Sequence, residues 1–74
     1  MTAVLHLYKG GDASLARAAI DAQLAAGHTV TLALLHGAEK PMVPDTVRVH
    51  RVPEELSWEQ LLETIFAADQ VVTW

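Results

Sequence analysis

Two helix patterns, each set between short apolar runs, most constrain what this chain folds into. The predicted order is strand, helix, strand, strand, helix and strand, over residues 3–8, 13–26, 28–36, 47–52, 57–69 and 70–74. Such alternation favours an α/β fold with a mostly parallel sheet, because a parallel pair needs a long crossover that a helix can supply. We therefore expect one domain over residues 1–74, with a four-stranded sheet and one helix on each face.

The predicted order of the strands is 2-1-3-4, numbered along the chain, with right-handed crossovers. In that order the topology reverses between the first and third strands, and ligands favour the crevice at the carboxyl ends of such strands. The segment 47–52 is expected to be partly exposed, because Arg48 and His50 point to one face. An antiparallel pairing of 28–36 with 47–52 stays open, although the loop 37–46 is long for a hairpin.

The second helix has the clearest boundary signals. Ser57 and Gln60 match a capping box, in which each side chain bonds the backbone N–H of the other residue. Asp69 closes the helix before the last strand. One stripe of the helical wheel is apolar and holds Trp58, Leu61, Leu62, Ile65 and Phe66. The pattern predicts an amphipathic helix, with Trp58 in the core or at a subunit interface.

The first helix is rich in alanine, which favours the helical state. Asp12 or Ser14 can cap its start, because either side chain can accept a bond from an unsatisfied backbone N–H. Gly27 ends it. The side expected to pack closely against a sheet holds Leu15, Ala18, Ala19, Ala22 and Ala26.

The run from Val71 to Trp74 is short, apolar and placed directly after the second helix. A tryptophan at this point predicts that the last strand is built into the core, with Trp74 in the core or at a subunit interface. Met42 lies between two prolines in the loop and is either an exposed contact for a partner or loop filler.

Composition narrows the functional classes. Hydrophobic residues make up 51% of the chain, which is more than so small a domain can easily cover, and predicts a homo-oligomer. A net charge of −4 argues against direct nucleic-acid binding. The apolar runs are too short to span a membrane and the N-terminus lacks signal-peptide features, so a cytoplasmic protein is expected. There is no cysteine and the histidines are widely spaced, so we predict neither a metal site nor another cofactor.

Three motifs give the chain a resemblance to a known family. They are Met1 to His6 with its Leu-His pair, Leu34-Leu35-His36-Gly37 after an apolar strand, and an acidic helix with a Val-Val-Thr-Trp end over Leu61 to Trp74. The chain resembles a shortened member of the DsrE/DsrF/DsrH superfamily, closest to the DsrH (TusB-like) branch. The resemblance covers most of the chain, with a shorter middle.

Members of that superfamily pass persulfide sulfur along a relay, in sulfur oxidation or in tRNA thiolation. The sulfur is carried on a cysteine thiolate, which can accept and release it reversibly. This chain has no cysteine, so the resemblance transfers no catalytic residue. It implies a non-catalytic subunit or assembly module, beside a cysteine-bearing DsrE-like protein.

An alternative function is binding of a small molecule or anion. Lys9, Gly10 and Gly11 lie between a strand and a helix start, where backbone amides can hold an anion. His36, at the end of an apolar strand, could join such a site, and His6 lies inside the first strand. The competing interpretations are a plain turn at the glycines and, for both histidines, a hydrogen-bonded side chain near the core. Glu54 follows the third strand at the predicted crevice, so a third hypothesis is an enzyme with His36 or Glu54 as base.

Overall fold

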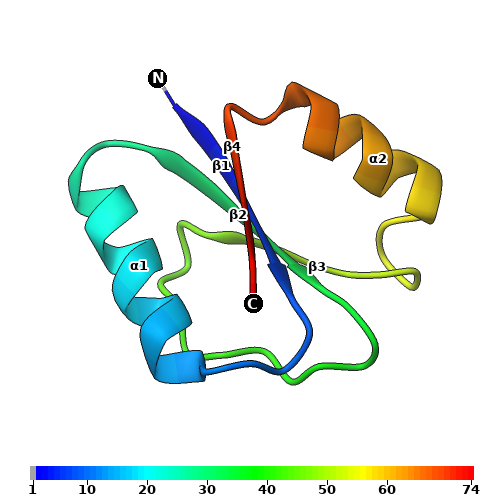
Figure 1. The fold of residues 1–74 in the computed structure, drawn as a ribbon, viewed down its shortest axis with the longest axis horizontal. Coiled ribbons are helices and arrows are strands. Elements are labelled where there is room, and N and C mark those ends of the chain that lie inside the picture. The colour runs from blue at the N-terminus through cyan, green and yellow to red at the C-terminus, as the bar shows by residue number, and fades with distance from the viewer. Residues whose placement is uncertain (1) are drawn as a thin grey trace.

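The structure, a computed structural model, describes residues 2–74 and contains all six predicted elements. These are β1 Ala3–Tyr8, α1 Ala13–Ala25, β2 Thr29–Leu34, β3 Arg48–Arg51, α2 Trp58–Ala67 and β4 Gln70–Thr73. Every strand pairing is parallel, and the two helices lie on opposite sides of the sheet (Figure 1). The predicted α/β class and the helix on each face are confirmed.

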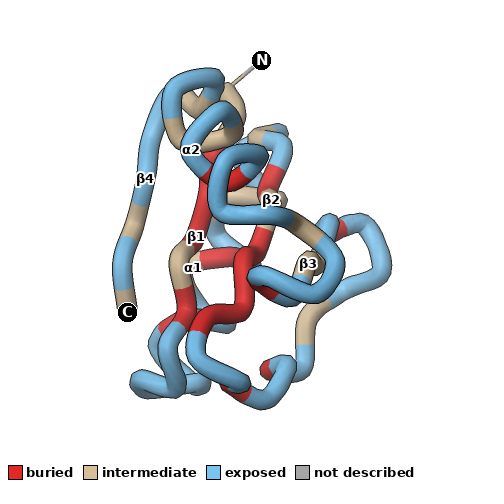
Figure 2. Tube along the Cα trace, turned by 90° about the vertical axis from the view of Figure 1, so that its right-hand side faces the viewer, coloured by how far each residue is buried: buried red, intermediate tan, exposed pale blue. Residues whose placement is uncertain are grey.

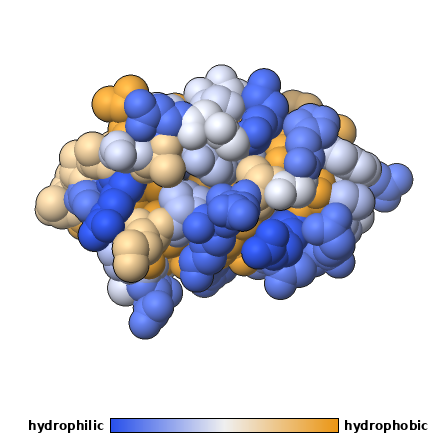
Figure 3. Space-filling model, turned by 90° about the horizontal axis from the view of Figure 1, so that it is seen from below, coloured by the Kyte–Doolittle hydropathy of each residue, from blue (hydrophilic) through white to orange (hydrophobic). Residues whose placement is uncertain are grey.

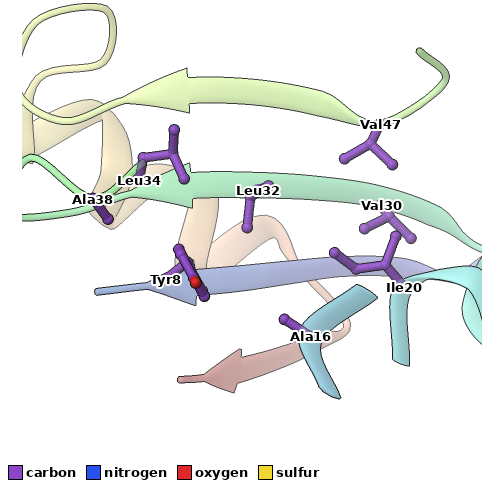
Figure 4. Packing of buried hydrophobic residues seen from close by; sticks show 8 residues of the cluster. All are labelled: Tyr8, Ala16, Ile20, Val30, Leu32, Leu34, Ala38 and Val47. Carbon is purple, nitrogen blue, oxygen red and sulfur yellow. The ribbon is translucent and has the colours of Figure 1, made fainter. Parts of the chain in front are cut away.

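The predicted strand order is wrong. The sheet has the order β3-β2-β1-β4, so β3 lies at an edge and not beside β1 (Figure 4). The predicted order would have placed β3 inside the sheet, with the exposed side chains of Arg48 and Arg51 among apolar neighbours. The topological switch therefore falls between β1 and β4, and not between the first and third strands as predicted.

The connections explain this order. The segment between β2 and β3 contains no helix and runs over the α1 side, where Ala38, Val43 and Val47 pack against the core. It returns to a place beside β2. The step from β3 through α2 to β4 then runs back across the sheet on the other face. The α2 crossover runs in the opposite direction across the sheet from the α1 crossover, and on the opposite face. The two crossovers therefore have the same handedness, as expected.

One core cluster lies between the sheet and α1. Its buried members are Tyr8, Ala16, Ile20, Val30, Leu32, Leu34, Ala38 and Val47 (Figure 4). The predicted sheet-facing side of α1 is wrong, since Leu15 is 60% exposed while Ile20 is fully buried. When α1 is rotated about its axis so that Ile20 and Leu24 face the sheet, more apolar area is removed from water than when alanines face it.

The second core cluster lies between the sheet and α2. It consists of Leu5, Ala33, Leu35, Val52 and Leu61. The predicted capping box is present, with the Ser57 hydroxyl accepting from the Gln60 N–H at 3.1 Å and the Gln60 side chain accepting from the Ser57 N–H at 2.9 Å. This fixes where α2 begins and thus which side chains face the sheet.

The last strand is an edge strand, which corrects the expectation that it is built into the core. Most of β4 is exposed, and no other strand of residues 2–74 pairs with its outer side (Figure 2). Besides the parallel pairing, hydrogen bonds at its two ends hold it to β1. The Asp69 carboxylate accepts from the Ala3 N–H at 2.7 Å, and the Trp74 N–H donates to the Leu7 carbonyl at 2.9 Å. Val72 and Trp74 are partly buried, and the Trp74 indole N–H donates to the buried His6.

Candidate functional site

The carboxyl edge of the sheet gathers the predicted ligand-binding residues, because all strands run in one direction. Lys9, Gly10 and Gly11 follow β1, His36 follows β2 and Glu54 follows β3, and all of them are exposed. Viewed from below, this end of the molecule shows polar residues with hydrophobic residues between them (Figure 3). Within residues 2–74, no hydrogen bond or ion pair joins the side chains of Lys9, His36 and Glu54, so they share an edge without forming a cluster.

The turn after β1 is held by contacts of its own. Gly10 has φ +98°, a conformation that other residues rarely adopt. A Cβ on Gly11 would lie 3.2 Å from the carbonyl carbon of Trp74, and the Tyr8 hydroxyl donates to the Gly11 carbonyl at 2.9 Å. The Asp12 carboxylate accepts from the Leu15 N–H at 3.0 Å. A negative charge thus already occupies the start of α1, which disfavours an anion there.

His36 and Glu54 occupy exposed turns. His36 has φ 55° and begins the turn after β2, so the expectation of a hydrogen-bonded histidine near the core is wrong for it. Its αL backbone turns the chain away from the sheet. Beside Glu54, Glu55 accepts from the Arg51 N–H at 2.9 Å, which ties the end of β3 to the turn before α2.

A buried polar network lies on the α1 side of the sheet. His6 is fully buried, and its Nδ1 accepts from the Trp74 indole N–H at 2.9 Å. Its Nε2 lies 2.6 Å from the Gln23 side-chain oxygen. Because the indole can only donate, His6 must carry its proton on Nε2 and donate it to Gln23. For His6, the interpretation as a hydrogen-bonded core histidine is confirmed, and neither ring nitrogen is left to act as a base.

Sequence reasoning missed Gln23, because it assigned the sheet-facing side of α1 to other residues. Gln23 follows Ala16 by seven residues and Ile20 by three, which places it on the buried side of α1. A polar side chain on that side needs a partner in the sheet, and His6 on the central strand provides it. The rings of Trp74 and His6 lie in nearly parallel planes, 12° apart, with their centroids 6.0 Å apart, as expected when the indole N–H bonds the edge of the imidazole.

A small hollow lies under α2 at the opposite end of the sheet from the predicted crevice. It measures about 100 Å³ and is lined by Ala3, Val4, Leu5, Thr31, Thr64, Ala67 and Ala68. The lining is mostly apolar and carries no charged side chain, and the Thr64 hydroxyl already donates to the Gln60 carbonyl at 2.8 Å. The hollow lacks the convergent polar groups of a typical ligand site.

The most distinctive surface is an exposed apolar stripe on α2. Trp58, Leu62 and Phe66 follow one another at intervals of four residues and are 54%, 53% and 81% exposed. The predicted apolar stripe therefore splits, because Leu61 turns to the sheet together with Ile65. An exposed row of this size is unusual on a helix whose sheet-facing side is already buried.

This stripe lies on the β4 side of α2. Thr64 and Ala67, on the other flank of the helix, line the hollow together with Thr31 of β2. On β4, Val71 is 40% exposed and pairs in register with Leu5, a member of the α2-side core, so it shares that face of the sheet. We call the surface formed by Trp58, Leu62, Phe66 and Val71 the α2–β4 face.

The residues predicted at an interface are thus separated in space. Trp58 belongs to the α2–β4 face, whereas Trp74 is part of the His6 network. Met42 is 79% exposed, and its sulfur lies 4.0 Å from the Arg17 guanidinium of α1, on the other side of the sheet. The structure does not bring the three together.

Comparisons with protein-family models, curated proteins and solved structures give no match. Within the described residues, no group of three or more histidine, aspartate, glutamate or cysteine side chains could hold a metal ion. No helix in the described part of the chain has the length and apolar character needed to cross a membrane. The resemblance to DsrH-like proteins therefore stays a prediction from the sequence motifs.

Proposed function

We propose that this protein is a non-catalytic assembly module that binds another protein subunit through the α2–β4 face. The observation that carries the proposal is the exposure of Trp58, Leu62 and Phe66 in one row beside Val71. Fully covered aromatic side chains bury about 150–250 Å² each, so this face offers several hundred Å² of apolar surface. Patches of that size on small proteins commonly mark interaction sites.

The residues at the carboxyl edge support the same conclusion. A general base needs a positioned partner and a substrate within hydrogen-bond reach. His36 and Glu54 lie on separate exposed turns, and His6 has both ring nitrogens engaged. A binding role uses the features that this chain has, whereas an enzymatic role requires a cluster that its described residues do not form.

The sequence resemblance supplies a context for the proposed module. DsrH-like proteins work in sulfur relays, where a persulfide is carried on a cysteine of a neighbouring subunit. A chain without cysteine cannot carry the sulfur itself. We therefore propose that its role in a relay, for sulfur oxidation or tRNA thiolation, is to hold or position a cysteine-bearing DsrE-like protein.

The test measures native mass by light scattering, for the protein alone and mixed with a cysteine-bearing DsrE-like protein from the same genome. Leu62→Glu places a charge in the middle of the α2–β4 face and should abolish assembly. Leu15→Glu is the matched control, because Leu15 is similarly exposed but lies on α1. A protein that stays monomeric in both samples, or an assembly that Leu62→Glu leaves intact, would refute the proposal.

A further inference from the structure

The two edges of the sheet differ in a way that points to a partner. The outer strand β3 carries Arg48 and Arg51, both exposed. Charged side chains of this kind protect an edge against pairing with another strand. The other outer strand, β4, reads Gln-Val-Val-Thr and has neither charge nor proline. Of the two edges, β4 is the one left open to a further strand.

The backbone of β4 is oriented for such pairing. The Trp74 N–H points to β1, where it donates to the Leu7 carbonyl at 2.9 Å. Because backbone groups alternate along a strand, the N–H and C=O groups of Val71 and Thr73 point away from β1. These outward groups can accept and donate in an antiparallel ladder with another β4.

The α2–β4 face lies directly beside this open edge. A twofold axis perpendicular to the sheet keeps both copies of α2 on the same side. Of the four strands, α2 contacts β1 most. Two copies of β1 on either side of a joined β4 pair would stand three strand spacings apart, or about 14 Å.

Directly packed helices are about 8–10 Å apart, so the two α2 helices would leave a gap between them. Trp58, Leu62 and Phe66 project into that gap from each copy, above Val71. Large side chains are needed to fill such a gap between the two helices.

The size of the surface agrees with a dimer. The four side chains of the α2–β4 face supply roughly 400 Å² per copy, judged from their exposed fractions and the usual area of such residues. The outer edge of β4 and the polar rim add to this. A standard interface takes about 800 Å² from each partner, which is around a sixth of the 4623 Å² surface of this chain.

We propose that a second copy of this chain covers the α2–β4 face, with its β4 antiparallel to the first β4 about a twofold axis at Val71. The two sheets then form one continuous sheet, and the apolar stripes of both copies pack together above the junction. This inference rests on the proposed assembly function and names a second copy of the chain, in place of a DsrE-like protein, as the subunit that covers this surface.

Disulfide cross-linking tests the arrangement on a clean background, because the chain has no cysteine of its own. Two residues that face each other in a hydrogen-bonded antiparallel pair have Cα atoms about 5.5 Å apart, within the range that a disulfide spans. Val71→Cys should therefore give covalent dimers in nearly every molecule on mild oxidation. Ala22→Cys, an exposed position on α1, should give few.

Two further measurements, the native mass and the cross-linking of a double variant, distinguish the proposed dimer from other arrangements. Light scattering of the unaltered protein should give twice 8.0 kDa, and adding Leu62→Glu to Val71→Cys should reduce cross-linking to the level of Ala22→Cys. Equal cross-linking of Val71→Cys and Ala22→Cys would overturn the proposed pairing. An 8.0 kDa protein that still binds a DsrE-like protein through the α2–β4 face would refute the dimer and leave the assembly function standing. An α2–β4 face that binds neither a second copy nor a DsrE-like protein would refute both the dimer and the assembly function.

Discussion

The His6 network gives a prediction whose size follows from the contacts. Gln23→Leu removes the oxygen that lies 2.6 Å from the His6 Nε2 and leaves the rest of α1 unchanged. His6 is fully buried and its other nitrogen accepts from Trp74, so the proton cannot move to a better-solvated atom. A buried donor left without a partner costs about 1–3 kcal/mol.

The expected result is a loss of that amount in the free energy of unfolding, measured by urea titration with circular dichroism. At about 4–8 °C per kcal/mol for a domain of this size, the midpoint of thermal unfolding should fall by roughly 4–24 °C. The double variant His6→Leu/Gln23→Leu removes the unpaired His6 donor and, like His6→Leu alone, leaves the Trp74 indole N–H without its acceptor. It should be less destabilised than the sum of the two single variants, by about 1 kcal/mol or more.

Two results would refute this reasoning. One is a Gln23→Leu protein that is within about 0.5 kcal/mol of the unaltered protein, the size of an ordinary surface change. The other is strict additivity of the two substitutions, which would mean that His6 and Gln23 do not interact in solution.

Three further predictions concern the core, the α2 cap and the turn after β1. Ile20→Ala should cost about 2–5 kcal/mol in urea titration, because the side chain is fully buried, and a cost under about 1 kcal/mol would contradict the observed face of α1. Ser57→Ala should cost about 0.5–2 kcal/mol through loss of the capping box, with no loss expected from the exposed Ser14→Ala. Phosphate should raise the unfolding temperature of the protein and of Lys9→Ala equally, since Asp12 already caps α1. A rise that depends on Lys9 would favour the anion-binding alternative.

Local sequence signals predicted the elements well because each signal acts within a few residues. The Ser57 and Gln60 pair set the start of α2, and Asp12 was one of two expected caps for α1. The strand order depends on which strands can lie at an edge of the sheet, where their side chains are exposed to water. The sequence contained a signal for the order, since the arginines of β3 suit an edge whereas β2 is apolar through its centre. Deciding which strand lies at the edge, however, requires comparing all four strands of the sheet.

The buried network could not be predicted in the same way. His6 is 17 residues from Gln23 and 68 residues from Trp74 along the chain, so only the tertiary fold brings the three side chains together. The division of the α2 stripe into a buried and an exposed row likewise depends on how α2 lies on β1. Periodicity identifies apolar positions on a helix without stating which of them the sheet has room to cover.

Hydrogen exchange of the backbone amides in the assembled protein tests the role of the α2–β4 face most directly. The Val71 and Thr73 amides point away from β1, so in an isolated copy they face water. We predict that both are protected in the assembly and exchange quickly in Leu62→Glu, while the Leu15→Glu variant keeps the protection. Val71 and Thr73 amides that exchange as fast in the assembly as in Leu62→Glu would contradict this account, because the outer edge of β4 would then be uncovered in the assembly.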